Sequence, residues 1–306
     1  MTTQRIYDFM GQRKLAAIAS AVLIIISLAS LVSKGLVLGL DFTGGTLIEV
    51  GFEQPVEIAP IRSRLTDSQF NDAVVVHFGT ETDLLIKLQG APAADLGDRV
   101  LSALRSSGEA VELRRIEFVG PQIGEELRDD GGLGMLAALA VVMLYVAIRF
   151  QYKFSIAAVA ALIHDVIITL GFFSVLGIEF DLSVLAAVLA VIGYSLNDTI
   201  VVSDRIRENF RLLRVADPIA VINESLSQTL GRTVITSLTT LLVLFALFFF
   251  GGELIHNFAI ALIVGVTVGT YSSIYIAANM LITLGICRED LMQTQKEGAA
   301  FDDGLP

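Results

Sequence analysis

The sequence predicts an α-helical polytopic membrane protein with six transmembrane helices and one α+β domain between the first and second helices. Hydrophobic residues make up 54% of the 306 residues and charged residues only 17%, which is outside the ordinary range of soluble proteins. Six segments are apolar and long enough to cross a bilayer, which needs roughly 20 residues per helix. Between the first two segments, apolar and polar residues alternate as they do in half-buried strands.

Charge and residue usage exclude several classes of function. The net charge is −11, and no basic stripe offsets it, which argues against a nucleic-acid partner. The single cysteine, Cys287, excludes an internal disulfide and matches no metal-binding or redox spacing. Three histidines in the whole chain argue against a catalytic zinc site. We therefore expect no metal.

The chain begins with a short basic lead and an apolar run. Residues 1–14 are expected to form an N-terminal segment outside the membrane, and residues 15–33 form the first predicted transmembrane helix. A cleaved signal peptide is the alternative, but its apolar core is normally about 7–15 residues long, with a small-residue cleavage site after it. This run is longer and Lys34 ends it, which favours an uncleaved anchor.

Residues 34–130 are predicted to form a separate α+β domain. The expected order is strand, helix, strand, strand, helix, strand, which is the ferredoxin-like βαββαβ arrangement. The predicted elements are residues 46–52, 58–65, 73–78, 83–88, 94–104 and 111–119. Because this fold occurs with many functions, it does not by itself specify one.

Residues 131–287 are predicted to form a five-helix transmembrane domain. The expected spans are residues 132–148, 154–178, 182–203, 233–252 and 258–287. Residues 204–231 mix basic and apolar side chains, which indicates a segment lying at the membrane surface, with a helix start at Asp217-Pro218. The polar, acidic tail at residues 288–306 is expected to be disordered.

The distribution of basic residues predicts the orientation in the membrane. Lysine and arginine are concentrated in the loops after the second, fourth and sixth spans: Arg149, Lys153, Arg205, Arg207, Arg211, Arg214 and Arg288. The opposite loops carry acidic residues and no lysine or arginine. By the positive-inside rule both termini are cytoplasmic, and the α+β domain lies on the far side of the membrane.

Asp198 is the most unusual residue of the predicted spans. A charge at such a position costs roughly 2.5–3.5 kcal/mol on insertion scales, so it indicates function. Arg232 begins the next span at the same predicted depth, and we expect the two side chains to meet across one helix contact. Protonation of Asp198 would then release Arg232. The alternatives are a purely structural hydrogen bond for Asp198 and a topology anchor for Arg232.

His164 and Asp165 lie in the middle of the third predicted span and are secondary polar candidates. They could instead cap or bridge helices structurally. If Asp165 and Asp198 lay at equal depth and shared a proton, they could form an intramembrane aspartyl protease dyad. Their unequal predicted depths, and Asn197 where such a motif would have glycine, count against an enzyme.

Three stretches carry a resemblance to a known family. They are GLDFTGGT at residues 39–46, VGPQIGEEL at residues 119–127, and GYSLNDTIVVSDRIREN at residues 193–209 with its continuation at 231–240. Together, in this order, they resemble the SecF family of the resistance–nodulation–division superfamily, subunits of the bacterial accessory protein-export complex. The resemblance covers roughly residues 5–290. Ser203 departs from it, because a large aromatic residue is expected there.

The resemblance implies a function, partners and site residues. Members of the family use the proton-motive force, together with SecD, to promote translocation of a preprotein through the SecYEG channel. It implies a multi-pass protein of the bacterial inner membrane with a periplasmic domain, YajC as a further partner, and protons as coupling ion with no cofactor. The proton-coupling residues that it implies are Asp198 and Arg232, with Thr236 as relay partner and Asn197 beside the acid.

The first two motifs flank the α+β domain where it joins the membrane helices. Glycine permits unusual backbone geometry and proline restricts it, so we expect hinges at Gly44-Gly45 and Gly120-Pro121. Asp41 and Gly124 belong to the same motifs. A tight connection without motion is the alternative. Two other functions also stay open: half of a proton-coupled small-molecule exporter, and a passive scaffold that anchors the domain.

Overall fold

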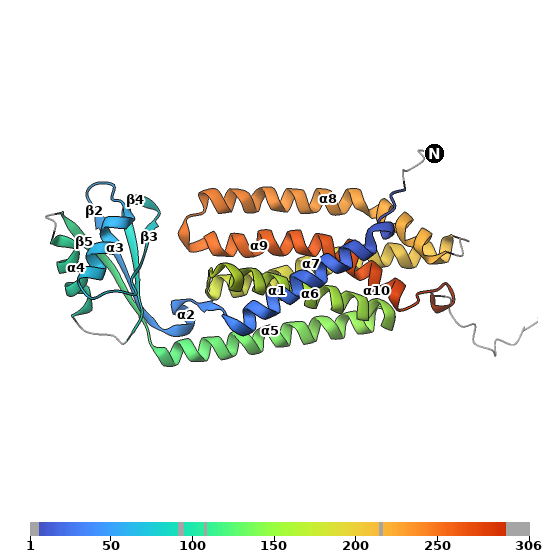
Figure 1. The fold of residues 1–306 in the computed structure, drawn as a ribbon, viewed down its shortest axis with the longest axis horizontal. Coiled ribbons are helices and arrows are strands. Elements are labelled where there is room, and N and C mark those ends of the chain that lie inside the picture. Colours follow the sequence, from blue (N-terminus) through green and yellow to red (C-terminus); the bar gives the residue numbers. More distant parts are fainter. Residues whose placement is uncertain (1–5, 91–94, 107–108, 214–216, 292–306) are drawn as a thin grey trace, which may run out of the picture.

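A small α+β domain and a long helical bundle make up the computed structural model, which describes residues 6–90, 95–106, 109–213 and 217–291 (Figure 1). The domain lies at one end of the bundle, and the described N-terminal residues lie near the other end. Most of the tail predicted to be disordered, residues 292–306, lies outside the described residues.

The α+β domain has the predicted ferredoxin-like order. Its elements are β2 (Gly45–Phe52), α3 (Ile58–Asp67), β3 (Val74–Phe78), β4 (Thr80–Leu88), α4 (Leu96–Arg105) and β5 (Val111–Val119). The strands form one sheet in the order β3-β4-β2-β5, and each neighbouring pair is antiparallel. The prediction of this fold from the alternation of apolar residues is confirmed.

One face of the sheet packs against the two helices and forms the core of the domain. Ile48 and Val50 of β2 and Ile86 of β4 are fully buried, and Leu65 of α3 and Leu104 of α4 cover them. Burial of each such side chain contributes about 1.5–3 kcal/mol. This core belongs to the domain alone, which explains why its sequence has the period of ordinary strands and helices.

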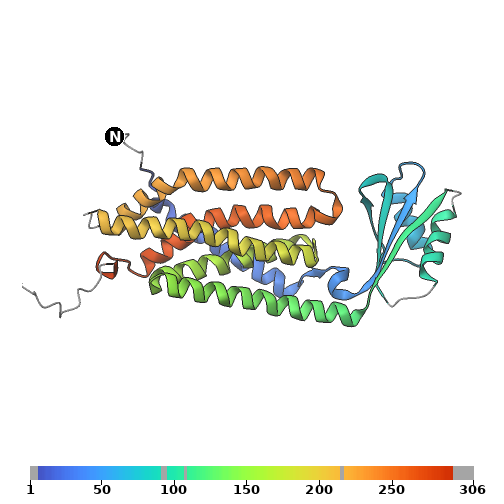
Figure 2. The same cartoon turned by 180° about the vertical axis from the view of Figure 1, so that it is seen from behind.

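The bundle contains the six predicted spans. They are Met10–Ser33 with α1 (Arg13–Ser33), α5 (Pro121–Arg149), α6 (Tyr152–Leu176), α7 (Leu182–Leu212), α8 (Pro218–Phe250), and a sixth that comprises α9 (Glu253–Ser272), the π-helical η2 (Ser273–Ala277) and α10 (Ala278–Thr283). Both α6 and α7 are central and largely buried, whereas α1, α5 and α8 are peripheral. Figure 2 shows α5 and α8 on opposite sides of the bundle.

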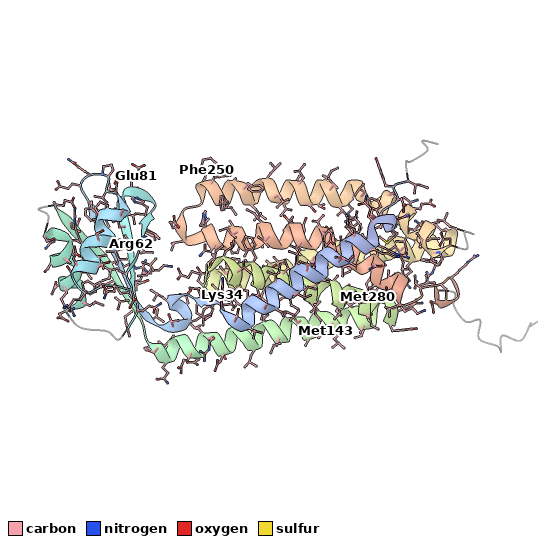
Figure 3. The ribbon with its side chains drawn as sticks, in the orientation of Figure 1. Lys34, Arg62, Glu81, Met143, Phe250 and Met280 are labelled. Carbon is pink, nitrogen blue, oxygen red and sulfur yellow. The ribbon has the colours of Figure 1, made fainter. Side chains whose placement is uncertain are left out.

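The peripheral helices expose broad apolar faces. Met143 of α5 and Phe250 at the end of α8 point away from the bundle (Figure 3), and the side chain of Phe250 is 89% exposed. On α1, Ile18 and Ile25 are similarly exposed. Faces of this size are not stable in water, so they suit contact with lipid or with another membrane protein.

Two helix boundaries differ from the prediction. Residues 204–231 belong largely to the ends of two long helices, because α7 continues to Leu212 and α8 begins at Pro218; their place at the membrane surface stays a prediction. Likewise α5 begins at Pro121, well before the apolar part of its sequence. The predicted helix start at Asp217-Pro218 is confirmed, since Asp217 Oδ1 accepts a hydrogen bond of 3.0 Å from the Ile219 amide.

A short pair of strands links the domain to the bundle. Residues of β1 (Val37–Leu38) pair in parallel with β6 (Glu179–Phe180), which lies between α6 and α7. Lys87 of β4 forms a salt bridge with Glu179, with Nζ–Oε distances of 3.0 and 2.9 Å. Asn257 at the start of α9 donates a 3.1 Å hydrogen bond to the Glu179 carbonyl. Glu179 therefore contacts both parts of the molecule.

Reversal of the charge at Lys87 is expected to loosen this link. Lys87→Glu places two carboxylates together, so amide hydrogen exchange in β1 and β6 should accelerate about fivefold, which corresponds to roughly 1 kcal/mol for a partly exposed ion pair. The double variant Lys87→Glu/Glu179→Lys should restore the protection. Arg115→Glu, in an exposed ion pair within β5, should leave it unchanged. Equal exchange in all variants would contradict the expectation.

Candidate functional site

Asp198 lies on the inner face of α7. It is 3% exposed, and Ser195 and Val202, about one turn away on either side, are buried with it. Asn197, about 100° away around the helix, is exposed. Within the described chain, Asp198 Oδ2 is buried and has no hydrogen-bond partner. A buried, unpartnered carboxylate oxygen is costly, which makes Asp198 the strongest functional candidate.

Arg232 lies on α8 and lines a cavity of about 430 Å³ between the C-terminal part of α7 and the N-terminal half of α8. The cavity is lined by Val201, Asp204, Arg205, Glu208, Gln228, Thr229 and Arg232. Arg232 is exposed there, whereas its neighbour Thr233 is 1% exposed and points inward. The arginine side chain therefore has room to change position.

The structure does not form the predicted contact between Asp198 and Arg232. Within the described residues no ion pair of 4.0 Å or less joins them, although the positive charge of Arg232 acts on Asp198 through space. The reason is rotational, because Asp198 faces the centre of the bundle and Arg232 faces outward. The two residues are thus electrostatic neighbours across the α7–α8 pair.

The two other predicted proton-coupling residues have distinct surroundings. The Thr236 hydroxyl donates to the backbone carbonyls of Arg232 and Thr233, each at 3.0 Å, so it is bonded within its own helix. Asn197 is exposed one turn before Val201, which lines the cavity. Asn197 thus lies on the α7 face that leads from the cavity toward mid-bundle.

Asp165 is the centre of a second buried polar cluster. Its side chain is fully buried in the middle of α6. Oδ1 lies 2.8 Å from His164 Nδ1, and Oδ2 accepts hydrogen bonds from Ser195 Oγ of α7 at 2.5 Å and Ser272 Oγ of α9 at 2.7 Å. The carboxyl group of Asp165 therefore joins three helices.

His164 extends this cluster to α1. Its Nε2 lies 3.1 Å from Ser20 Oγ, and Ser20 Oγ lies 3.0 Å from the Tyr271 hydroxyl of α9. Tyr271 in turn donates a 2.8 Å hydrogen bond to the Ala16 carbonyl. An unbroken chain of contacts thus runs from α1 to α7 through His164 and Asp165.

The two carboxyl groups do not form a protease dyad. No hydrogen bond joins Asp165 to Asp198 among the described residues, and Asp165 is already bonded to His164, Ser195 and Ser272. A shared proton needs direct contact between two acids. The arrangement gives no support to an intramembrane aspartyl protease.

The sequence did not single out Ser20 or Tyr271. A signal was present in α1, where Ser20, Ser27 and Ser30 are the polar residues that lie on one helix face of an otherwise apolar run. All three serines are buried in the structure. A serine stripe, however, does not reveal which helix it meets, so its partner His164 could not be inferred.

The two junction motifs form one interlocked joint. Gly44 has a φ of +73°, and a Cβ there would lie 2.8 Å from the Pro121 Cα. A Cβ on Gly124 would lie 2.9 Å from the Phe42 carbonyl carbon, and one on Gly45 would lie 2.4 Å from the Leu88 oxygen. Side chains at Gly44 or Gly124 would therefore push the two motifs apart, and one at Gly45 would push the first motif away from β4. The predicted hinge motion stays a prediction, and the contacts are those of a tight joint.

The other two motif residues hold helix ends. Gly120 is the N-cap of α5, and its carbonyl accepts a 3.0 Å hydrogen bond from the Gly124 amide. Asp41, in the short helix α2 (Leu40–Thr43), accepts a 3.0 Å hydrogen bond from the Leu182 amide at the start of α7. The first junction motif thus also contacts the helix that carries Asp198.

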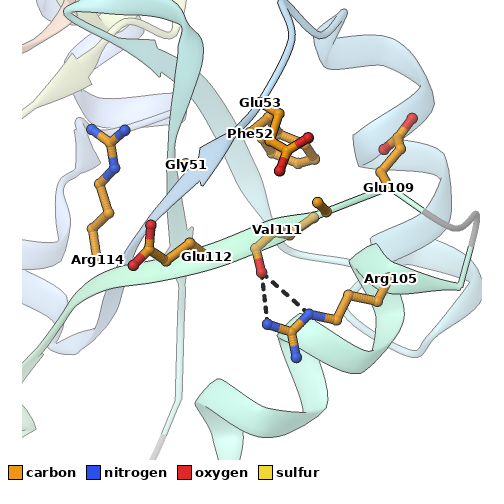
Figure 4. A pocket seen from close by; sticks show the side chains of 9 residues that line it. Gly51, Phe52, Glu53, Arg105, Glu109, Val111, Glu112 and Arg114 are labelled. Atoms are coloured by element: carbon orange, nitrogen blue, oxygen red, sulfur yellow. Dashed lines mark hydrogen bonds between the residues drawn. The ribbon is translucent and has the colours of Figure 1, made fainter.

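A separate cavity of about 530 Å³ lies in the α+β domain, between the end of β2 and the start of β5 (Figure 4). Arg105 Nε and Nη2 donate hydrogen bonds of 3.2 and 2.7 Å to the Val111 carbonyl at its wall. Nearby, the hydrogen bond to Glu109 raises the pKa of Arg64. Across the described ranges, His, Cys, Asp and Glu form no group of three that could hold a metal ion.

The chain matches a known family of membrane proteins and several of its curated members. The family described as "Protein export membrane protein SecD/SecF, C-terminal" matches residues 99–286, and the SecD/SecF GG motif matches residues 29–56. The chain is 50% identical to protein translocase subunit SecF of Vibrio alginolyticus, over 99% of this chain and 98% of that one. It is 52% identical to SecF of Pseudomonas aeruginosa, over 96% and 97%.

Solved structures agree with these relatives. The crystal structure of SecDF from Thermus thermophilus, a translocon-associated membrane protein, has a TM-score of 0.80 and 40% identity, and the match covers 93% of this chain. The present chain spans 39% of that longer chain. A super-membrane-facing form of SecDF matches with a TM-score of 0.72. The chain therefore belongs to the SecF family of protein translocase subunits, non-catalytic multi-pass membrane proteins of the Sec pathway in the bacterial inner membrane.

Proposed function

We propose that this chain, together with SecD, couples the proton-motive force to the movement of a preprotein through the SecYEG channel. Protons are the coupling ion, and Asp198 is the group that binds them. The observation that carries the proposal is the buried Oδ2 atom of Asp198, which has no hydrogen-bond partner in the described chain. Its setting inside a membrane-length helix is the usual one for proton-relay carboxylates.

Arg232 is the group that responds to protonation. While Asp198 is ionised, its charge attracts the guanidinium across the α7–α8 pair. A proton on Asp198 removes the attraction, and Arg232 moves into the cavity beside it, where Asp204 and Glu208 offer other partners. Two positions of one side chain, selected by one proton, give the two states that a coupled cycle needs.

The voltage supplies enough free energy for such a step. One elementary charge crossing 100 mV releases about 2.3 kcal/mol, so a few protons per cycle drive a domain rearrangement. The interlocked joint at Gly44, Pro121 and Gly124 passes movement of α5 to the α+β domain. In this proposal Gly44-Gly45 and Gly120-Pro121 are the hinges, and they move together because Gly44 lies against Pro121.

The distribution of basic residues supports an orientation of this chain in the membrane, and its relatives support a partner. Both termini are cytoplasmic and the α+β domain is periplasmic, as the positive-inside rule indicates. SecD contacts one of the exposed apolar faces of α1, α5 and α8. The longer SecDF chain, of which this chain spans 39%, supports a partner of that kind. YajC is proposed as a further neighbour of the complex.

The test of this proposal is export into sealed vesicles that contain this chain with SecD and SecYEG. Arg232→Met is expected to lower gradient-driven export by roughly 50-fold, because the loss of one coupled charge at 100 mV corresponds to about 2.3 kcal/mol. Arg205→Met is the matched control, since Arg205 lines the same cavity and bonds to Gln228 and Glu208. Equal gradient-driven export by both variants would refute the role of Arg232.

A further inference from the structure

The His164–Asp165 pair is a buried titratable group that the proposal for Asp198 and Arg232 does not use. His164 is 3% exposed and Asp165 is fully buried, both in the middle of α6. A lone ionised carboxylate at this depth would cost several kcal/mol. The charge state of the pair therefore matters, and the hydrogen bonds around it reveal that state.

Donor counting begins at the α1 end of the cluster. A tyrosine hydroxyl has one proton, and Tyr271 donates it to the Ala16 carbonyl. The 3.0 Å contact between Tyr271 and Ser20 must then use the Ser20 proton. With its proton used, Ser20 can only accept at its 3.1 Å contact with His164 Nε2. Nε2 of His164 therefore carries a hydrogen.

The same donor counting shows that a proton lies between His164 Nδ1 and Asp165. Ser195 and Ser272 both donate to Asp165 Oδ2, which leaves the 2.8 Å contact between His164 Nδ1 and Asp165 Oδ1. Two lone pairs would repel at this distance, so one proton lies between these atoms. Whether Nδ1 or Oδ1 holds it, the pair contains a second proton beyond the one on Nε2. Its net charge is zero.

We infer that the His164–Asp165 pair is a second proton-binding site of this chain, loaded in this structure, which exchanges its proton with Asp198 by way of Ser195. The inference rests on the proposed function, because it adds a station to the same proton path. Ser195 bonds to Asp165 and lies three residues before Asp198 on the buried face of α7. A hydroxyl both donates and accepts, so Ser195 can pass a proton between the two acids.

Release of a proton leaves a negative charge on the pair. The proton passes from the Asp165 carboxyl group to the Ser195 oxygen while Ser195 gives its own hydroxyl proton to Asp198. One O–H bond breaks and one forms at Ser195, the hydrogen on His164 Nε2 stays in place, and the pair acquires a net charge of −1. The lone pairs of Nδ1 and Oδ1 then face each other, which favours the return of a proton to the pair.

The surroundings contain few other groups that could supply the proton. The described side chains bonded to the pair are Ser20 from α1, Ser195 from α7 and Ser272 from α9. Tyr271 stacks on the imidazole at a centroid distance of 6.2 Å. The π-helical η2 begins directly after Ser272, and π-helical turns within α-helices occur often at functional sites. Asp198 is the acid nearest along α7 to a side chain bonded to the pair.

The test measures proton entry into sealed vesicles that hold the complete complex and an internal pH-sensitive dye. Asp165→Asn keeps the shape of the side chain but cannot carry the proton, so proton entry should fall roughly 100-fold, the contribution typical of a positioned proton-transfer group. Asp165→Glu should retain measurable entry. Ser174→Ala is the matched control, since it removes the 2.8 Å Ser30–Ser174 bond between the same two helices without removing a titratable group.

A second pair of variants separates proton binding from a structural role, and also serves if Asp165→Asn does not accumulate. Ser272→Ala removes one donor to Oδ2, which disfavours the ionised carboxylate, so the pH at which proton entry is half-maximal should shift upward. Ser195→Ala removes the hydroxyl that passes the proton, so proton entry should fall as it does in Asp165→Asn. A purely structural cluster predicts lower thermal stability with an unchanged pH profile, and that result would overturn the inference.

The outcomes also distinguish this inference from the proposed function. If Asp198→Asn abolishes proton entry and Asp165→Asn leaves it at the parental rate, the second site is refuted and Asp198 stands. If neither variant changes proton entry, the proposed function fails as well. If both abolish it while Ser174→Ala does not, the path includes both acids.

Discussion

Asp198→Asn is expected to abolish the gradient-dependent part of preprotein export. Asparagine preserves the size of the side chain, but it cannot bind or release a proton, so Arg232 no longer experiences two charge states. The loss of one driven charge at 100 mV corresponds to about 2.3 kcal/mol, or roughly 50-fold in rate or extent. The measurement is the amount of preprotein translocated into vesicles with and without an imposed proton gradient.

Two further variants make this result specific. Asp129→Asn makes the same substitution at an exposed acid of α5, where Asp129 lies 3.3 Å from Arg128, and gradient-dependent export should persist. Asp198→Glu keeps a titratable group and should retain part of it. Full gradient dependence in Asp198→Asn would mean that the spans act only as the passive scaffold considered from the sequence.

Gly265→Val is expected to destabilise the bundle strongly. Helices α7 and α9 pack so closely that a Cβ on Gly265 would lie 2.1 Å from the Val191 side chain. Adding a branched side chain to this contact forces the helices apart, and overpacking of this kind costs about 3 kcal/mol. Because Ser195 and Ser272 bond to Asp165 from these same helices, their separation also breaks the polar cluster. The measurement is thermal unfolding of the purified complex.

Gly193→Ala provides the matched control on α7. A Cβ at Gly193 would meet no heavy atom within 4 Å of those considered in the structure, and alanine stabilises a helix interior relative to glycine by up to about 1 kcal/mol. We expect an unchanged or slightly higher unfolding temperature. Comparable losses in the two variants would show that glycine matters for backbone flexibility rather than for close packing.

The sequence predicted the elements whose pattern repeats along the chain. The ferredoxin-like order followed from alternation in segments such as β2 and β4, and the six spans followed from their apolar length. Asp198 could be identified because a carboxylate within an apolar run is costly wherever the helix faces. In each case the evidence lay within one segment, so no knowledge of its neighbours was needed.

Contacts between side chains of different helices could not be predicted from the sequence, because they depend on how the helices are rotated relative to each other. Asp198 and Arg232 were expected to touch because their depths matched, but their side chains point in different directions from α7 and α8. The polar cluster that joins Ser20 and the His164–Asp165 pair to Ser195 and Ser272 needs the relative placement of four helices. Residues 204–231 have a mixed composition that does not distinguish a surface segment from the extension of two long helices.

The pairing of β1 with β6 also bears on how the protein is made. The two ends of this junction are far apart in the chain, since Asp41 and its partner Leu182 are separated by 141 positions. All strands of the α+β sheet, in contrast, lie between Gly45 and Val119. During synthesis the domain can thus complete its own core while the first span waits without its later neighbours. Attachment of the domain to the bundle must follow insertion of α6, which makes the junction a late step of biogenesis.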